Sequence, residues 1–435
     1  MKNMKIGVLS FHGWNQQHFN MQGKRVANIG DSIREVVMWQ ILSECGLKSD
    51  DIVMVSQEEL MRYSGEEIRL IFDDMINDNC VIDCIMENSL IHPVFVSCFF
   101  YDDIFVGRPD RVEYFKKYAP IGCRDQHSRD LCIRNGIEAY LVGCFTICIK
   151  PQEELCGEKV YLVDIDKDVI GQFPESIIQN AISKTHAVEL EKYPITPDES
   201  KRLFQLAIDY LEEYKNHAKL VISGRLHAVI PCFAMGIPVI IINQNYNFKF
   251  GWVDKWLKFY DTENKGEIDF FPCIDSEKKK EVDKVRNLIK ENIAYAVKTG
   301  RNNLNFLKDI DRIYMGREKT ELNLYFKSIL LKDLSSYKRD EEFSYAIWGA
   351  GLNGGYVYQI MRELFPYSTL KVIIDKYKTG TKYGAPIVSM YELKKFDIQH
   401  IIVSSSPAIS EAVRYIRTLP KLKEHYSILV TKQTC

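Results

Sequence analysis

The sequence lacks several features that would place it in a specialised class of protein. No stretch of about 18 consecutive apolar residues occurs, which excludes a membrane-spanning helix. The net charge is only −2, so nothing global indicates binding to nucleic acid or to an anionic membrane. The first apolar run, IGVLSF, is too short for a secretory signal. We therefore expect a cytoplasmic protein with at most peripheral membrane contact.

The chain has 12 cysteines, but no two of them have C-x-x-C spacing. Most lie in apolar, strand-like runs, for example Cys98, Cys144 and Cys232. Two pairs have four-residue spacing, but their surroundings also look like strands, which argues against zinc ligands. We expect reduced, buried cysteines that act as small hydrophobic side chains, and no metal site.

The 435 residues are 46% hydrophobic and 12% aromatic, enough for two or three domains with large cores. Short apolar strands alternate with amphipathic helices, which predicts an α/β fold with parallel sheets. Among these elements we expect strands at 81–86 and 93–100 and a helix over 248–260. We expect two Rossmann-like halves, at 1–150 and 151–265, joined to a small Rossmann-like domain at 341–435 by a helical linker at 266–340.

The most informative stretch is 219–243, KLVISGRLHAVIPCFAMGIPVIIIN. It predicts a buried strand, a turn at Ser223 and Gly224, a helix that Gly236 ends, and a second buried strand. Arg225 and His227 then lie at a helix N-terminus, where free N–H groups and the helix dipole favour an anion. Two interpretations remain open. Either the pair forms a phosphate or oxyanion site, or Arg225 pairs with a local carboxylate and His227 is packed.

This stretch resembles the SxRLHxxxxxxxxGxP signature of the polysaccharide pyruvyl transferase family. Four further segments resemble that family in the same order: NIGD at 28–31, PIGCRDQHSRDL at 120–131, GIEAYLVGCFT at 136–146 and VYLVD at 160–164. The resemblance covers roughly residues 5–260. It implies a GT-B-like pair of Rossmann-like domains.

The resemblance also implies an activity. Members of the family transfer a pyruvyl group from phosphoenolpyruvate to two hydroxyls of a sugar or glycan, which gives a ketal. We expect such a role in bacterial surface-polysaccharide biosynthesis. The transfer requires no metal and no redox cofactor, and nucleic acid is not an expected partner. A homo-oligomer remains open.

Site roles follow from the chemistry of that donor. We assign Arg225, with Ser223 and Gly224, to the phosphate, because a guanidinium matches an O–P–O edge. His227 is the candidate proton donor or phosphate partner, because imidazole titrates near neutral pH. Arg124 is the candidate for the donor carboxylate. The alternative for Arg124 is a salt bridge with Asp125 between the two halves.

The turn at Asn28, Gly30 and Asp31 is assigned to the acceptor side. Asp31 is the candidate base for a sugar hydroxyl, although it equally suits the role of helix cap. Lys249 and Trp252, which follow the last strand, are expected to line the cleft between the halves.

The sequence departs from the family pattern before and after the strand PVFVS. The tryptophan that precedes this strand in related sequences is absent, and so is the histidine that follows it; residues 86–90 read MENSL and residues 98–100 read CFF. This departure indicates either a different acceptor sugar or another transfer reaction on the same scaffold.

A second motif lies near the C-terminus. Gly349, Gly351 and Gly354 form G-x-G-x-x-G between a predicted strand and helix, and Asp375 ends the next strand 21 residues later. This arrangement predicts a nucleotide or NAD-type ligand. The alternative is that the glycines only allow tight packing of strand against helix.

Two other functions remain open from the sequence. One is a GT-B-type glycosyltransferase that binds a nucleotide sugar, with Arg225 on the diphosphate. The other is a catalytically inactive protein that binds a nucleotide or sugar. A phosphate site at Arg225 suits both transferases, which differ in their donor.

Overall fold

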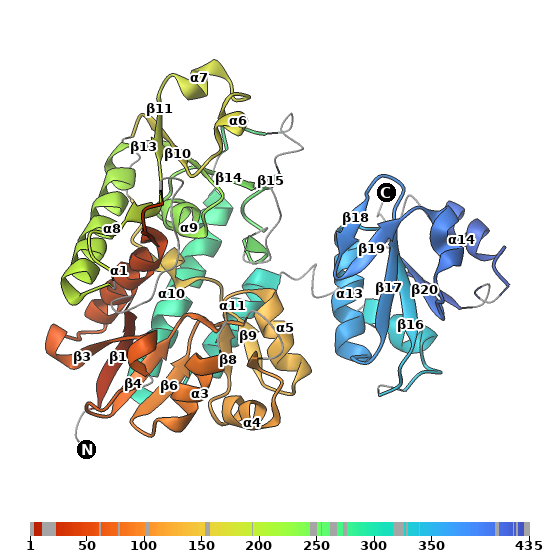
Figure 1. Ribbon diagram of the computed structural model, residues 1–435, viewed down its shortest axis with the longest axis horizontal. Helices are drawn as coiled ribbons and strands as arrows, with labels where there is room; N and C mark the ends of the chain where they lie inside the picture. Colours follow the sequence, from red (N-terminus) through yellow and green to blue (C-terminus); the bar gives the residue numbers. More distant parts are fainter. Residues whose placement is uncertain are drawn as a thin grey trace. The chain divides into compact units, whose positions relative to one another are not determined.

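The computed structural model divides the chain into two compact units, residues 1–314 and 315–435, which are described separately (Figure 1). The structure describes residues 4–10, 23–60, 62–76, 79–100, 105–152, 157–193, 195–243, 250–253, 255–261, 268–272, 276–315, 326–327, 329–338, 340–404, 409–420, 422 and 425–429. No helix in these ranges is long and apolar enough to cross a bilayer.

The first unit begins with a four-stranded parallel sheet of order β3-β1-β4-β6. Its strands are β1 (Lys5–Ser10), β3 (Ile52–Ser56), β4 (Ile68–Phe72) and β6 (Ile91–Phe95). A single parallel backbone β-bridge pairs residue Cys98 with Cys123, and both thiols are free. It continues the sheet towards the parallel pair β8 (Ile121–Cys123) and β9 (Ala139–Leu141). The helices of this half are α1 (Ile29–Glu44), α2 (Gln57–Leu60), α3 (Asn79–Glu87), α4 (Pro109–Lys117) and α5 (Gln126–Arg134).

Two elements of this half differ from the sequence prediction. The strand expected at 81–86 is part of helix α3, which buries Val81, Ile82 and Ile85 at helical spacing. The single strand expected at 93–100 is instead β6 followed by the short β7 (Phe99–Phe100), which pairs with β5 (Met75–Ile76). A short apolar run does not distinguish these possibilities, because both conformations bury it equally well.

The second half of the first unit contains a five-stranded parallel sheet of order β11-β10-β13-β14-β15. Its strands are β10 (Lys159–Val163), β11 (Ala181–Lys184), β13 (Ala218–Ser223), β14 (Val239–Asn243) and β15 (Phe259–Asp261). Its helices are α6 (Lys167–Ile170), α7 (Glu175–Ile178), α8 (Pro197–His217) and α9 (Leu226–Ala234). The prediction of a helix over 248–260 is wrong at its end, because residues 259 and 260 belong to β15, which pairs with β14 at the edge of the sheet.

Helix α1 lies between the two sheets, where Figure 1 shows it in red. It contacts β1 of the first half and α8 and α9 of the second. Its buried residues include Ile29, Ile33, Val37 and Ile41, at the spacing of a helix with one apolar stripe. Beside its start, β2 (Val26–Asn28) pairs antiparallel with β12 (Ala187–Glu189), so backbone hydrogen bonds join the halves.

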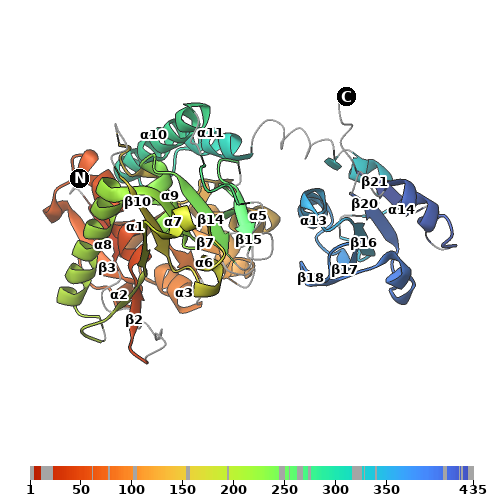
Figure 2. The same ribbon diagram turned by 90° about the horizontal axis from the view of Figure 1, so that it is seen from above.

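The segment expected to be a linker is largely an integral part of the first unit. Helix α10 (Ser276–Thr299) buries an apolar stripe, and α11 (Leu304–Met315) follows it along one side of the unit (Figure 2). Between them, the Asn302 amide donates to the carbonyls of Phe95 (2.7 Å) and Pro120 (2.9 Å). The first unit therefore extends to residue 314. The charged start of α10, which suggested a linker, is the solvent-facing side of an amphipathic helix.

The second unit has one sheet of order β18-β19-β17-β16-β20-β21, parallel except for β18. Its strands are β16 (Ser344–Trp348), β17 (Thr369–Ile374), β18 (Gly380–Lys382), β19 (Ala385–Val388), β20 (His400–Val403) and β21 (Tyr426–Ile428). Helices α13 (Leu352–Leu364) and α14 (Ile409–Ile416) pack on this sheet. β16, the first of these strands along the chain, lies in the middle of the sheet. Strands β17 and β19 are added on one side of it and β20 and β21 on the other, as in Rossmann-like folds.

The predicted fold class, α/β with parallel sheets, is confirmed in both units. The predicted burial of Cys98, Cys144 and Cys232 is also confirmed, and all three thiols are free.

Candidate functional site

The start of α1 is anchored to the second half of the first unit. The Asn28 side chain caps the helix by accepting a hydrogen bond from Gly30 N (3.2 Å). The next amide, Ile29 N, donates to the carbonyl of His186 (2.8 Å). One of the free N–H groups of the helix terminus is therefore used to join the halves. The predicted turn at residues 28–31 thus lies at the junction of the two sheets.

Gly30 packs directly against His227. A Cβ atom built on Gly30 would lie 3.0 Å from His227 Cβ and 3.1 Å from its Nδ1. Only glycine fits there without a shift of the imidazole. Two motifs that are almost 200 residues apart in the chain therefore meet, as the sequence predicted for opposite sides of one site. Asp31, half-buried, follows in the first turn of α1.

The other edge of the His227 ring faces the segment after β9. His227 Nε2 lies 3.6 Å from Cys144 Sγ, and this sulfur lies 3.2 Å from Thr146 Oγ1. Cys144 and Thr146 are fully buried at the start of the short 3-10 helix η3 (Phe145–Cys148). His227 is thus held between Gly30 and Cys144, and its ring orientation is restricted on both sides.

Arg225 is the N-cap residue of α9 and is held by the end of β13. Its backbone N–H donates to Ser223 Oγ (2.9 Å), and this hydroxyl donates to the carbonyl of Val163 on β10 (2.9 Å). Its side chain is 44% exposed and donates from Nε to Asp164 Oδ2 (2.8 Å). The local carboxylate partner considered from the sequence therefore exists, and within the described ranges no hydrogen bond involves the terminal nitrogens of this guanidinium.

Arg124 follows β8 and is almost completely buried, with 6% exposure. Its backbone N–H donates to the carbonyl of Cys98 (2.7 Å), and its Nη2 donates to the carbonyl of Asp73. Its Nε is buried without a hydrogen-bond partner in the described part of the chain. A buried donor without a partner is costly, and such donors in native proteins often face a ligand or water that satisfies them.

Arg124 and Asp125 do not form the salt bridge that the sequence left open as an alternative. Asp125 is the N-cap of α5 and accepts from Ser128 N (2.9 Å) and Ser128 Oγ (3.1 Å). Burial raises the pKa of Asp125 to about 7, although the Ser128 hydrogen bonds and the charge of Arg124 oppose the rise. The carboxylate is used for capping because the chain turns into a helix immediately after β8.

A buried ionic cluster next to Arg124 was missed in the sequence. Arg34 of α1 pairs through Nη1 with Asp74 Oδ1 (2.7 Å), and its Nε lies 3.6 Å from Asp73 Oδ2. All three side chains are at most 7% exposed. Burial raises the pKa of Asp73 to about 6, although Arg34 opposes this rise. The available signal was the pair of acids directly after β4, at the carboxyl edge of a parallel sheet.

A comparison with family models identifies this region. Residues 106–246 match the polysaccharide pyruvyl transferase family. The matched segment includes Arg124, the Cys144 segment, and the turn with Arg225 and His227, which confirms the resemblance seen in the sequence. The family is one of transferases, and the chain is accordingly assigned to this class of enzyme. No curated protein and no solved structure matches the chain.

Other residues predicted to contribute to the site are placed differently. Lys249 lies outside the described residues. Trp252 is 1% exposed and packs against Tyr314 and the backbone of Gly143, so it belongs to the core rather than to a sugar-binding surface. No cluster of histidine, cysteine or acidic side chains in the described ranges could hold a metal ion.

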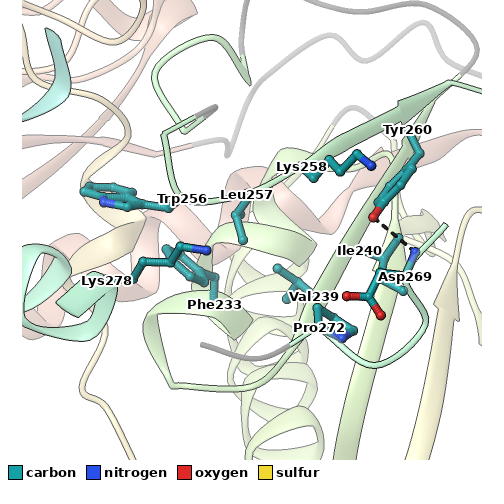
Figure 3. A pocket seen from close by; sticks show the side chains of 10 residues that line it. All are labelled: Phe233, Val239, Ile240, Trp256, Leu257, Lys258, Tyr260, Asp269, Pro272 and Lys278. Carbon is teal, nitrogen blue, oxygen red and sulfur yellow. Dashed lines mark hydrogen bonds between the residues drawn. The ribbon is translucent and has the colours of Figure 1, made fainter. Parts of the chain in front are cut away.

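A cavity of about 260 Å³ lies at the amino ends of β14 and β15 in the five-stranded sheet (Figure 3). Arg225 and His227 follow the carboxyl end of β13 in the same sheet. Val239, at the start of β14, and Trp256, before β15, are on its wall, together with Lys258 and Lys278. None of the site residues expected from the sequence lines it. Ligands of parallel sheets bind beyond the carboxyl ends of the strands, and Arg225 and His227 lie there instead.

The glycine motif of the second unit has the expected geometry. Gly349 has φ of 118°, and a Cβ on Gly354 would lie 2.0 Å from the Gly349 carbonyl oxygen. A Cβ on Gly351 would meet nothing within 4 Å among the residues that the structure describes. Gly349 and Gly354 are therefore required by the fold, whereas the space at Gly351 leaves room for a ligand to approach the backbone.

Asp375 is bound to this glycine-rich turn. Its Oδ2 accepts from Ala350 N (2.9 Å), and its Oδ1 accepts from Tyr377 N (3.0 Å) and Lys378 N (3.1 Å). Burial would raise the pKa of Asp375, but these backbone hydrogen bonds lower it below its usual value. Lys382 Nζ donates to the carbonyl of Ala350 from the other side (2.8 Å). The turn is thus held by an ionised acid and a cation.

Proposed function

We propose that the first unit is a cytoplasmic transferase that moves a pyruvyl group from phosphoenolpyruvate to two hydroxyls of a sugar or glycan, in the assembly of a bacterial surface polysaccharide. One observation carries the proposal. Arg124 and Arg225 follow strands of two different sheets, and the two halves meet where Gly30 packs against His227. An imidazole packed against the start of α1, and one guanidinium that follows a strand in each half, support this proposal.

The donor has two anionic groups, and each arginine suits one of them. Arg225 offers its terminal nitrogens as a fork to the phosphate, beside the turn of Ser223 and Gly224. Arg124, with its buried and unsatisfied Nε, suits the carboxylate. A carboxylate bound there would satisfy the donor and offset the charge of the buried guanidinium.

The transfer must move two protons. Protonation of C3 makes C2 electrophilic, and the first sugar hydroxyl attacks C2. The second hydroxyl then replaces the phosphate at C2, and the C2–O bond to phosphate breaks. Of the two hydroxyl protons, one balances the proton added to C3 and the other leaves with the phosphate. The reaction therefore needs an acid and a base but neither an oxidant nor a reductant.

His227 and Asp31 are the groups we assign to these proton transfers. His227 donates the proton or stabilises the leaving phosphate, because its ring lies beside the N-terminus of α9. Asp31, in the first turn of α1, acts as base for a sugar hydroxyl. Asp73, with its pKa near 6, is a further group that can exchange a proton at neutral pH beside Arg124.

Ligand-dependent thermal stabilisation tests the donor. Phosphoenolpyruvate at about 100 times its Kd should stabilise the wild type by roughly 2.7 kcal/mol. The stabilisation should be strongly reduced, but still measurable at higher ligand concentration, in Arg225→Ala and in Arg124→Ala. It should persist in Arg312→Ala, a control that removes a 68% exposed guanidinium from α11. If nucleotide sugars stabilise the wild type and phosphoenolpyruvate does not, the enzyme is a glycosyltransferase instead.

For the second unit we infer a nucleotide or NAD-type ligand at the turn of Gly349 to Gly354. The open space at Gly351 and the acceptor carboxylate of Asp375 support this proposal. A pyrophosphate would approach the Gly351 backbone, and Asp375 would accept from a ribose hydroxyl. The transfer proposed for the first unit does not require this ligand.

A further inference from the structure

The carboxylate of Asp164 lies at the end of β10 and contacts three donors. It accepts from Arg225 Nε (2.8 Å), from Thr185 Oγ1 (2.6 Å) and from His186 N (3.0 Å). Its own backbone N–H donates to the carbonyl of Lys184 (3.0 Å). The carboxylate is therefore fixed by the segment after β11 before Arg225 is considered. This rigidity is what a residue needs to orient another side chain.

Asp164 has a left-handed backbone, with φ of 51°. Among the described residues, the only other non-glycine residue with positive φ is Tyr383. Aspartate adopts this backbone more readily than most residues, because its short side chain can form local hydrogen bonds. Here the side chain accepts from Thr185 and His186, and the contact with Arg225 comes in addition. Residues in such sparsely populated backbone regions cluster at functional sites, which is consistent with a positioning role for Asp164.

The contact with Asp164 uses only one edge of the Arg225 guanidinium. In the described part of the chain, Nε is the one nitrogen of this group with a hydrogen-bonded carboxylate. The side chain of Arg225 is 44% exposed, whereas that of Asp164 is 19% exposed. Within the described ranges no hydrogen bond involves Nη1 or Nη2, so these two nitrogens remain as a pair of donors that can bind two oxygens of one anion.

The same segment also holds the start of α1. His186 donates its N–H to Asp164, and its carbonyl accepts from Ile29 N. Ile29 precedes Gly30, which contacts His227. A single residue thus connects the anchor of Arg225 to the helix that positions His227.

We propose that Asp164 is a positioning residue that holds Arg225 at Nε, so that Nη1 and Nη2 form a fork for a phosphate group. This inference rests on the proposed function, because it assigns a phosphate ligand to Arg225. Asp164 does not touch the ligand. Its effect on binding passes through Arg225, and this property separates it from a residue that only stabilises the fold.

Calorimetric titration with phosphoenolpyruvate and with inorganic phosphate tests the proposal. Asp164→Asn is the informative variant, because asparagine tolerates the left-handed backbone but lacks the charge. We expect a roughly tenfold loss of affinity for both probes, the scale of one charge-assisted hydrogen bond. Asp168→Asn removes an exposed acid from the adjacent helix α6 and should bind both probes as the wild type does.

A double-mutant cycle decides whether Asp164 acts through Arg225. In the Arg225→Ala background, Asp164→Asn should cause no further loss of affinity. The Nε–H resonance of Arg225, which a carboxylate partner shifts, should also move in Asp164→Asn and remain in place in Asp168→Asn. Equal losses in both backgrounds, or an unchanged resonance, would overturn the proposal.

The two proposals fail in different ways. If the wild type binds inorganic phosphate but not phosphoenolpyruvate, the donor assignment is wrong, and the cycle with phosphate still tests Asp164. If phosphoenolpyruvate binds and Asp164→Asn binds it equally well, the proposed function stands and the role of Asp164 is refuted. If neither probe binds the wild type, both proposals fall.

Discussion

His227 lies against Gly30, and a methyl group on that glycine would come within 3.0 Å of the imidazole Cβ. This contact brings the first turn of α1 and the first turn of α9 together. It places the proposed acid and the proposed base on the facing ends of two helices, each held by its own sheet.

Gly30→Ala should reduce turnover by at least tenfold with little loss of stability. The added methyl group displaces His227 by a few tenths of an ångström, while alanine favours the helical backbone by up to about 1 kcal/mol. Steady-state kinetics and thermal unfolding would measure both effects. Gly171→Ala is the control, because its Cβ would meet only atoms at ordinary distances, 3.6 and 3.9 Å. Full activity in Gly30→Ala would show that this contact does not position the histidine.

Asp74→Asn should destabilise the first unit by roughly 3–5 kcal/mol. The substitution leaves the buried guanidinium of Arg34 without its closest charged partner. Asp110→Asn breaks an exposed ion pair with Arg108 and should leave stability nearly unchanged, because such pairs are screened by solvent. Chemical denaturation of both variants makes the comparison. Similar midpoints for the two variants would contradict the assignment of Arg34 to a buried cluster.

Glu35→Gln should make the stability of the protein less sensitive to a rise in pH between about 5 and 8. Burial raises the pKa of Glu35 from 4.5 to about 8, and the charge of Arg34 only partly opposes this. The folded state therefore holds a proton on Glu35 that the unfolded state releases, so the contribution of this carboxyl to stability is greatest below pH 4.5. That contribution falls by about 1.4 kcal/mol per pH unit up to about pH 8.

Thermal unfolding at several pH values checks this prediction. Between pH 5 and pH 8 the melting temperature of Glu35→Gln should fall less than that of the wild type, because glutamine has no proton to lose. Glu87→Gln, at the exposed end of α3, should behave as the wild type. Parallel curves for wild type and Glu35→Gln would mean that this carboxyl is ionised in the folded protein.

Two glycine variants separate folding from ligand binding in the second unit. Gly354→Ala forces a Cβ to within 2.0 Å of the Gly349 carbonyl and should unfold or strongly destabilise this unit. In Gly351→Ala the added methyl group has no neighbour within 4 Å in the described part of the second unit, so this variant should fold normally. If a nucleotide binds at the turn, Gly351→Ala should lose binding of NAD and nucleotide sugars in calorimetry. If wild type and Gly351→Ala both fail to bind them, the glycines serve packing alone.

The sequence was most informative where periodic apolar strands meet turn residues. The strand, turn, helix and strand of 219–243 were predicted nearly to the residue, because a short buried strand followed by glycine and a helix leaves few alternatives. The meeting of Gly30 with His227 was implied only by the family resemblance, since no local pattern relates positions so far apart.

The cluster of Arg34, Asp73 and Asp74 shows why part of the site could not be predicted. Charged residues are usually solvated, and Arg34 lies in a helix whose composition gives no reason to expect a buried guanidinium. Burial of these groups depends on how α1 packs between the sheets, which is a property of the tertiary structure. The misread segment at 81–86 has a similar cause, because its apolar residues suit either a strand or a short helix.

The short antiparallel pairing of β2 with β12 has a consequence for motion. Enzymes built from two α/β halves commonly open and close about a hinge to admit their substrates. Here a backbone strap, continued by the hydrogen bond from Ile29 to His186, crosses between the halves next to the proposed phosphate site. Separation of the halves at this edge would break the backbone hydrogen bonds of the strap. We therefore expect any opening motion to pivot about the strap, close to Arg225, so that the phosphate end of the proposed site moves least.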